Sequence, residues 1–424
     1  MDDKTAEIVN QQYEQYPYPY REAEHEKERL LSPGMSDLSL VNSLGFKGKA
    51  DISKFRVLIA GGGTGDAVIF LAEQLKTFSE AEVVYCDLSE ASMKIAQERA
   101  NVRGLDNIVW LNKSLFDLSE YINYFDYINC SGVLHHLEDP ASGLKFLNNL
   151  LKPNGIIAIM VYAQIGRTAV YQIQDLIKLV ASDKKDLKEK IDIAKNIMQT
   201  LPDTNWWHHS KEYITDYPLG GDAGIVDLLL HSQDRAYSIS QLYELIAQAD
   251  LNLVDFIMPN RYELLPETHG ISGELLSLVK EFPKQKQQAI VELFSGNIIK
   301  HSCFLSKKDN KDTKADPSDI NAIPFFYGMM RDGVELADSI DKSNFITVTA
   351  TLNKYYKVTF NVGRYTTKIL RNINGEKSIK DIVSEIVAAN SNSVSEEEVL
   401  DEFIELFNSM NAVDVILLKY SHPD

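Results

Sequence analysis

Short apolar runs alternate along residues 55–162 with segments in which apolar residues recur at helical spacing. Within residues 66–76, for example, Val68, Leu71 and Leu75 fall on one face of a helix. Short strands that alternate with helices indicate βαβ crossovers and therefore a parallel sheet. The predicted strands are RVLIA, EVVYC, NIVWLN, FDYINC and IIAIMVY, and the predicted helices cover residues 66–76, 89–99 and 140–152.

The same patterns divide the chain into six predicted regions. Two later apolar runs, LNLVDFIM and NIIKHSCFL, are typical of strands that return to the sheet, and the polar stretch SKKDNKDTKADPSD is typical of a linker. We predict an α/β fold with a Rossmann-like, mostly parallel twisted sheet, a helical insertion and a small C-terminal α+β domain. The regions are an N-terminal helical arm or lid (1–50), the Rossmann-like core (51–162), a substrate-side helical insertion (163–240), returning strands (241–306), a linker (307–320) and the C-terminal module (321–424).

The N-terminal arm carries the aromatic segment YEQYPYPYRE. Residues before proline favour extended geometry, so the segment is not expected to continue a helix. Two interpretations stay open: an exposed flexible arm, or an arm that folds over a site and contributes Tyr16 and Tyr18 to it.

A glycine-rich loop follows the first predicted strand. Gly61, Gly63 and Gly65 form G-x-G-x-G, and Asp87 ends the next strand 22 residues after Gly65 (87 − 65). An acid at about this distance bonds the ribose hydroxyls of adenosine-type cofactors. Asp66 places a negative charge at the helix start, where a pyrophosphate would otherwise bind. The loop therefore favours a cofactor without phosphates, S-adenosylmethionine.

Five segments together resemble the class I S-adenosylmethionine-dependent methyltransferases throughout residues 55–162. They are VLIAGGGTG, VVYCDLS, NKSLFDL, FDYINCSGVLHHLEDP and LLKPNGIIAIMVY. The resemblance implies that the glycine loop lies under the cofactor, Asp87 holds its ribose and Leu88 packs on its adenine. Cys130 and Ser131 would line the floor near its methionine end, although Cys130 equally fits a small buried residue. The implied cofactor-binding residues are Gly61, Gly62, Gly63, Gly65, Asp66, Asp87, Leu88, Ser114, Leu115, Cys130, Ser131 and Tyr16.

Two positions depart from the family pattern. Ile59 stands where members usually carry an acid two residues before the first glycine, so Asp66 or an arm tyrosine would have to complete the polar network. Ser114 stands where an acid usually holds the adenine amine, although Ser114 and the Leu115 backbone can still offer hydrogen bonds.

Methyl transfer from a sulfonium needs mainly alignment and exclusion of water, so no metal is expected. A general base is needed only for an acceptor that arrives protonated. Candidate catalytic residues are His135, His231 and Tyr237, with the alternative that His135 only bonds the backbone at the strand end. Candidate acceptor contacts are Tyr18, His208, Arg235 and Arg261.

Several acceptor classes are disfavoured by the sequence. The stretch NCSG replaces the Asn/Asp-Pro-Pro-aromatic motif common in enzymes that methylate exocyclic or amide nitrogens. A net charge of −18 disfavours nucleic acids. Proteins or peptides and small metabolites remain, and a binding subunit that senses S-adenosylmethionine or S-adenosylhomocysteine without turnover is the alternative from another class. A nicotinamide oxidoreductase is a remote alternative.

The C-terminal module favours a protein or peptide acceptor. Its segment FNVGRYTTKILRNINGEKSIKDIVSEI resembles the small winged-helix peptide-binding domain of the peptide chaperone that serves pyrroloquinoline quinone synthesis. This resemblance implies that the module pairs a peptide with a strand edge. As an alternative to peptide binding, the module could form a dimerisation surface or a stabilising cap. A dimerisation surface would imply a homodimer.

Three separated cysteines, Cys86, Cys130 and Cys303, form neither a disulfide framework nor a zinc motif, which favours a reducing compartment. The N-terminal residues lack the pattern of a secretory signal, and no apolar run reaches the length of a membrane span. The expected location is the cytoplasm.

Overall fold

The computed structural model of the chain describes residues 3–184, 186–214, 220–265, 269–328, 333–340, 345–349, 357–390 and 394–421. The chain forms two compact units. The first unit contains Met1–Asp37, Ile52–Leu253 and Glu292–Asn310, and the second contains Leu38–Asp51, Val254–Val291 and Lys311–Asp424. The boundaries drawn from the sequence stay predictions.

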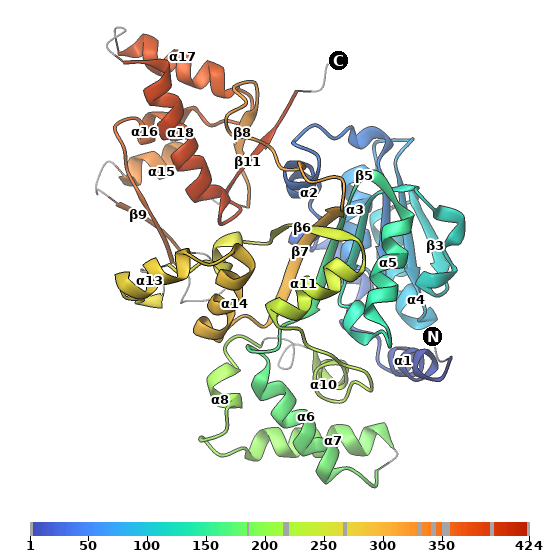
Figure 1. The fold of residues 1–424 in the computed structure, drawn as a ribbon. Coiled ribbons are helices and arrows are strands. Elements are labelled where there is room, and N and C mark those ends of the chain that lie inside the picture. Colours follow the sequence, from blue (N-terminus) through green and yellow to red (C-terminus); the bar gives the residue numbers. More distant parts are fainter. Residues whose placement is uncertain are drawn as a thin grey trace. The chain divides into compact units, whose positions relative to one another are not determined.

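A seven-stranded sheet forms the centre of the first unit, in the order β3-β2-β1-β4-β5-β7-β6 (Figure 1). The pairs from β3 to β5 are parallel, and β7 runs antiparallel to β5. The predicted Rossmann-like, mostly parallel sheet is therefore confirmed. The strands are β1 Arg56–Ala60, β2 Glu82–Asp87, β3 Ile108–Asn112, β4 Phe125–Ser131, β5 Leu151–Tyr162, β6 Leu251–Phe256 and β7 Lys300–Lys307.

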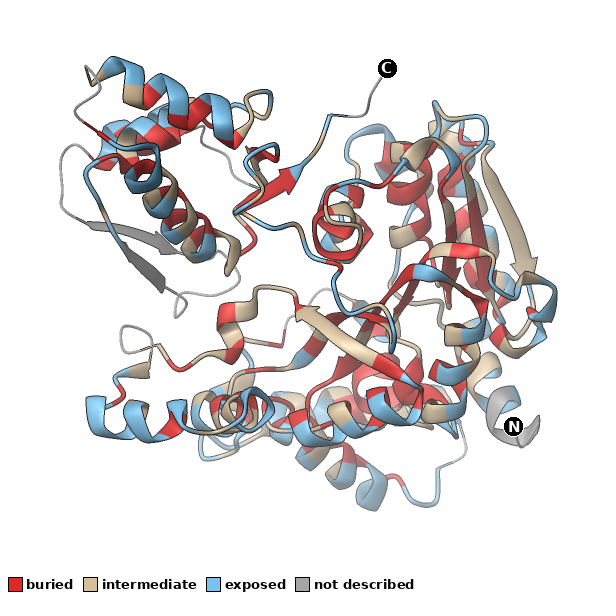
Figure 2. Ribbon diagram, turned by 45° about the horizontal axis from the view of Figure 1, so that its top comes forward, coloured by how far each residue is buried: buried red, intermediate tan, exposed pale blue. Residues whose placement is uncertain are grey.

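The central strands are buried because helices cover them, as Figure 2 shows. In β1, Val57, Leu58 and Ile59 are at most 2% exposed, which explains the continuous apolar run of this strand. Asp139 is the N-cap of one covering helix, since its side chain accepts a hydrogen bond from the Ser142 N–H. The helices of the arm and core are α1 Asp3–Gln15, α3 Asp66–Leu75, α4 Glu90–Arg103, α5 Pro140–Leu150 and α11 Ile239–Gln248.

The segment between β5 and α11 is helical, and Figure 1 shows its helices grouped together. They share an apolar cluster that includes Val170, Ile173, Ala194 and Val226. Their bounds are α6 Thr168–Val180, α7 Leu187–Thr200, α8 Trp207–Ser210 and α10 Gly221–Leu229.

The second unit has a separate core, which includes Ile369, Ile382 and Phe403. Two antiparallel pairs of strands, β9–β10 and β8–β11, accompany its helices. The elements are α2 Leu38–Gly45, α13 Gly273–Lys280, α14 Lys284–Ser295, β8 Ile323–Phe326, α15 Gly333–Ile340, β9 Phe345–Thr349, β10 Lys357–Asn361, α16 Thr366–Asn372, α17 Ile379–Ala389, α18 Glu396–Asn411 and β11 Ile416–Lys419.

Early residues belong to this second core, because α2 packs against β11. The Leu418 N–H donates to the Ser43 hydroxyl at 3.4 Å, and the Tyr420 N–H donates to the Gly48 carbonyl at 3.1 Å. A Cβ atom at Gly48, where φ is +75°, would lie 2.8 Å from the Leu418 carbonyl oxygen. The close approach of these two segments therefore requires glycine at this position.

A buried acid should make the second unit sensitive to pH. Burial raises the pKa of Asp414 from 3.8 to about 7, although the Met258 N–H donates to this carboxylate. The folded state therefore holds a proton that the unfolded state has lost between about pH 4 and pH 7, and its stability falls as pH rises through that window. We expect Asp414→Asn to remove this slope in urea unfolding measured at pH 5 and pH 8. An unchanged slope would mean that Asp414 ionises normally.

Candidate active site

The loop between β1 and α3 is tightly packed. Gly61, Gly63 and Gly65 have φ values of +76°, +50° and +105°. A Cβ atom at Gly61 would lie 2.2 Å from the Val133 Cγ2 atom, and one at Gly63 would lie 3.0 Å from a backbone oxygen. Side chains are excluded at these positions both by the backbone conformation and by the neighbouring atoms. The loop forms a backbone cradle at the carboxyl end of β1, in which Gly61, Gly62 and Gly63 are half-buried.

Asp87 stands beside this cradle and holds its shape. One carboxylate oxygen accepts from the Gly63 N–H and the other from the Ser89 N–H, both at 2.8 Å. Burial raises the pKa of this carboxyl group. The next side chain, Leu88, is 38% exposed, so an apolar surface lies next to the carboxylate.

The other predicted cofactor residues lie at the ends of β3 and β4. Ser114 caps the short helix that begins at Leu115 and accepts from the Phe116 N–H. Cys130 is fully buried, and burial raises the pKa of its thiol to about 12. The Ser131 hydroxyl donates to Asn129 at 2.7 Å. Because of its raised pKa, the Cys130 thiol is protonated and unreactive at neutral pH.

The N-terminal arm lies on the glycine loop. The Thr64 hydroxyl donates to the Pro19 carbonyl at 2.6 Å, and the backbone oxygen that approaches Gly63 belongs to Tyr18. The Tyr16 ring packs against the apolar cluster of the helical segment. The arm thus spans from the cofactor loop to the helical segment.

A network of ion pairs fixes the arm to the loop. Arg21 forms two hydrogen bonds with Asp66, at 2.8 and 2.5 Å. Arg99, which is 1% exposed, donates to Asp66 at 2.8 Å, to the Thr64 carbonyl at 2.7 Å and to Glu26 at 2.6 Å. Burial acts to raise the pKa of Asp66, but the two arginines outweigh it and lower this pKa. Asp66 is therefore ionised, and its carboxylate binds the arm through Arg21.

A cluster of five rings, the ring cluster, lies where β4 and β5 end. The His135 and Tyr162 ring centres are 4.0 Å apart, and those of His135 and His136 are 4.2 Å apart. His136 stacks on His231 at 3.7 Å, and Tyr13 of α1 lies 5.7 Å from His231. The structure thus brings two predicted catalytic residues, His135 and His231, into one cluster.

Asp227 of α10 joins the arm to this cluster. Its carboxylate accepts from the Tyr13 hydroxyl at 2.9 Å and from the Tyr162 hydroxyl at 3.1 Å. Burial raises its pKa, while His136 and the two hydroxyl groups lower it. A buried acid of this kind orients both tyrosines and leaves their oxygen lone pairs free to accept hydrogen bonds from donors of the methyl acceptor.

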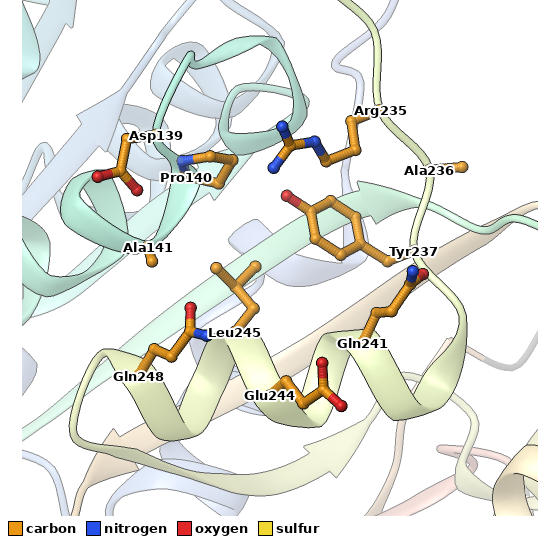
Figure 3. A pocket seen from close by; sticks show the side chains of 10 residues that line it. All are labelled: Asp139, Pro140, Ala141, Arg235, Ala236, Tyr237, Gln241, Glu244, Leu245 and Gln248. Carbon is orange, nitrogen blue, oxygen red and sulfur yellow. The ribbon is translucent and has the colours of Figure 1, made fainter.

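A pocket of about 420 Å³ lies between α5 and α11. Figure 3 shows the Tyr237 hydroxyl and the Arg235 guanidinium group on the same side of it, pointing toward Pro140. Tyr237 is 5% exposed, and its hydroxyl has no hydrogen-bond partner among the described residues. The Tyr237 N–H donates to the Tyr162 carbonyl, which places this pocket next to the ring cluster.

Two predicted acceptor contacts lie elsewhere. The His208 ring nitrogen lies 3.3 Å from the Leu201 carbonyl oxygen, a bond within the helical segment. Arg261 lies in a short helix of the second unit, Pro259–Tyr262. Neither belongs to the ring cluster.

Four residues of the ring cluster and its hydrogen bonds were not among the predicted site residues: Tyr13, His136, Tyr162 and Asp227. The signal for Asp227 was present, since it is an acid inside the apolar run GIVDLLL. Tyr162 ends the last strand of the alternating pattern. An unexpected acid in an apolar helix is thus a useful pointer to a buried polar site.

Comparisons with known proteins agree with this geometry. A methyltransferase domain family matches residues 58–157. An uncharacterised protein of Synechococcus sp., syc1184_c, is 30% identical over 313 residues, which cover 72% of this chain and 73% of the relative. The chain belongs to the S-adenosylmethionine-dependent methyltransferases.

Other methyltransferases match a smaller part of the chain. The tRNA 5-carboxymethoxyuridine methyltransferase of Escherichia coli is 33% identical over 115 residues, 27% of this chain and 42% of its own length. PKMT2 from Rickettsia typhi in complex with AdoHcy superposes with a TM-score of 0.63 at 15% identity, covering 92% of this chain and 78% of that structure. This second likeness concerns the fold and extends over most of both units.

The residues of the loop fit the cofactor. The cradle admits no side chain at Gly61, Gly63 or Gly65, and Asp87 presents a carboxylate beside it. S-adenosylmethionine, when bound, supplies the methyl group on a positively charged sulfur. Asp87 would hold the ribose, and the arm would exclude water from the loop. None of the helices in the described part of the methyltransferase is long and apolar enough to cross a membrane.

Proposed function

We propose that this methyltransferase transfers a methyl group to a side chain of a protein or peptide. The supporting observation is the second compact unit, which lies outside the matched methyltransferase domain and has its own buried core. Such a unit is not needed for binding the cofactor, and recognition of a large acceptor gives it a role.

The open strand edges of the second unit suit this role. Among the described residues, β9–β10 and β8–β11 are sheets of two strands each. A peptide can extend such a sheet by backbone hydrogen bonds, as the winged-helix resemblance of the module implies. A small metabolite is the second candidate, because the pocket beside Tyr237 has the volume of a small-molecule site.

The test is transfer of radioactive methyl from S-adenosylmethionine in cell extract. We expect a labelled protein band. Label only in the small-molecule fraction would favour the metabolite, and label only in RNA would favour the kind of acceptor named for the Escherichia coli relative. Cofactor binding without any transfer would favour a regulatory subunit.

Two proline variants test the strand edge. Successive N–H groups of a strand point to opposite edges, so Val358→Pro and Thr359→Pro in β10 each remove a donor from a different edge. We expect one variant to weaken the hairpin and the other to reduce protein labelling while cofactor affinity stays unchanged. If both stably folded variants label the protein normally, this edge does not bind the acceptor.

A further inference from the structure

Buried polar atoms without partners gather beside the ring cluster. Among the described residues, no hydrogen-bond partner is present for Nε and Nη2 of Arg167, for either ring nitrogen of His135, or for Nε2 of His231. These side chains are 1%, 0% and 6% exposed. An unpartnered buried polar atom destabilises the folded protein, so such a group of them indicates a binding site for a further molecule.

Arg167 is the charged member of this group. It lies between the end of β5 and the start of α6, and its guanidinium carbon is 3.5 Å from the centre of the Tyr162 ring. The described residues form no ion pair with it within 4.0 Å, while the Tyr171 hydroxyl and the charge of Asp234 lie close enough to act on it. A buried cation without a paired anion is costly, and an anionic ligand would remove that cost.

His135 and His231 contribute hydrogen-bond donors to the same group of unpartnered atoms. His231 Nδ1 accepts from the Gln233 N–H, and burial lowers the pKa of His231 to about 2. Its ring is therefore neutral, and its proton sits on Nε2, the unpartnered nitrogen. Burial also lowers the pKa of His135 well below its usual range, so that ring is neutral and offers one N–H.

The neighbouring acids do not use these donors. Both oxygens of Asp227 accept from tyrosine hydroxyl groups. Asp234 has a charge that acts on Arg167, but one of its oxygens accepts from Gln174 at 3.0 Å and the other has no partner among the described residues. The site therefore presents more unpartnered donors than acceptors, and the charge of Asp234 only partly offsets the permanent positive charge of Arg167.

We propose that Arg167, His135 and His231 bind a carboxylate group of the methyl acceptor. A carboxylate has two oxygens with about four lone-pair sites, which suits a guanidinium group flanked by imidazole N–H groups. Tyr162 ends β5, and His135 lies in the short helix that follows β4, the strand paired with β1 ahead of the cofactor loop. We therefore place the bound group on the acceptor side of the cofactor. The proposal deepens the proposed function and rests on it, since it specifies an acidic residue in the acceptor protein or peptide.

Binding of two matched peptide mimics tests the site. Glutamate and glutamine with both backbone ends capped have the same shape and differ only in the terminal carboxylate or amide. We expect the enzyme loaded with S-adenosylhomocysteine to bind capped glutamate at least about tenfold more tightly than capped glutamine in calorimetry, the scale of one charged hydrogen bond. Equal binding of the two compounds by the unaltered enzyme overturns the proposal, whatever the variants do.

The variants locate the site. Arg167→Gln should remove the preference for capped glutamate, whereas Lys178→Gln removes a charge from the exposed side of α6, the helix that Arg167 precedes, and should keep the preference. A folded Arg167→Gln enzyme that binds S-adenosylhomocysteine and still prefers the carboxylate would also refute the assignment. Because binding is measured without transfer, this experiment can fail while protein labelling succeeds, and the reverse.

Discussion

Replacing Asp87 with alanine should weaken binding of S-adenosylmethionine by about 10- to 150-fold, or about 1.5–3 kcal/mol. The variant loses the carboxylate that would hold the ribose. It also loses the acceptor of the Gly63 and Ser89 N–H groups, both at 2.8 Å, so the cradle loses its fixed shape. Calorimetric titration with S-adenosylhomocysteine measures the effect directly.

The conservative variant separates these two contributions. Asp87→Asn keeps one oxygen that can accept from a backbone N–H but removes the charge, and should fall between alanine and the native enzyme. Tightly bound cofactor in a folded Asp87→Ala enzyme would show that the ribose lies elsewhere. The glycine loop would then need another explanation.

Removal of residues 1–24 should reduce turnover by about 100-fold or more while the sheet stays folded. The truncated enzyme lacks Arg21, which holds Asp66, and Tyr13, which donates to Asp227 at 2.9 Å. The loop and the ring cluster would then be open to water and less well aligned, and misalignment by about 1 Å already costs about that factor. Single-turnover methyl transfer, followed together with circular dichroism, measures both properties.

Two point variants in the arm provide a matched pair. Tyr13→Phe removes the hydroxyl group that donates to buried Asp227 and should slow transfer measurably. Tyr20→Phe removes a hydroxyl group that donates to Glu22 at the surface, where the ring is 58% exposed, and should leave transfer unchanged. Full activity of the truncated enzyme would make the arm a tail without a role in catalysis.

The sequence could predict those parts of the site that are formed by residues close together along the chain. The loop from Gly61 to Gly65 and the acid at Asp87 follow from local spacing, because a strand, a tight turn and a helix determine their geometry. The sheet could be predicted for the same reason. The predicted helix 140–152 ends earlier, at Leu150, because Leu151 already pairs with Phe125 at a register shift in the sheet.

The acceptor side of the site depends on contacts between distant parts of the chain. Tyr13 and Asp227 are 214 residues apart, and Glu26 and Arg99 are 73 apart. No local pattern relates such pairs, so the arm's place over the loop stayed an open alternative. The four-residue strand β8 was missed for another reason, since IPFF is too short to show a period.

The place of α2 in the second core has a consequence for synthesis of the protein. Ser43 leaves the ribosome 375 residues before its partner Leu418. The apolar face of α2 therefore stays uncovered until β11 has been synthesised. A stop codon before β11 would leave that face exposed, which makes such truncated products targets for chaperones and proteases.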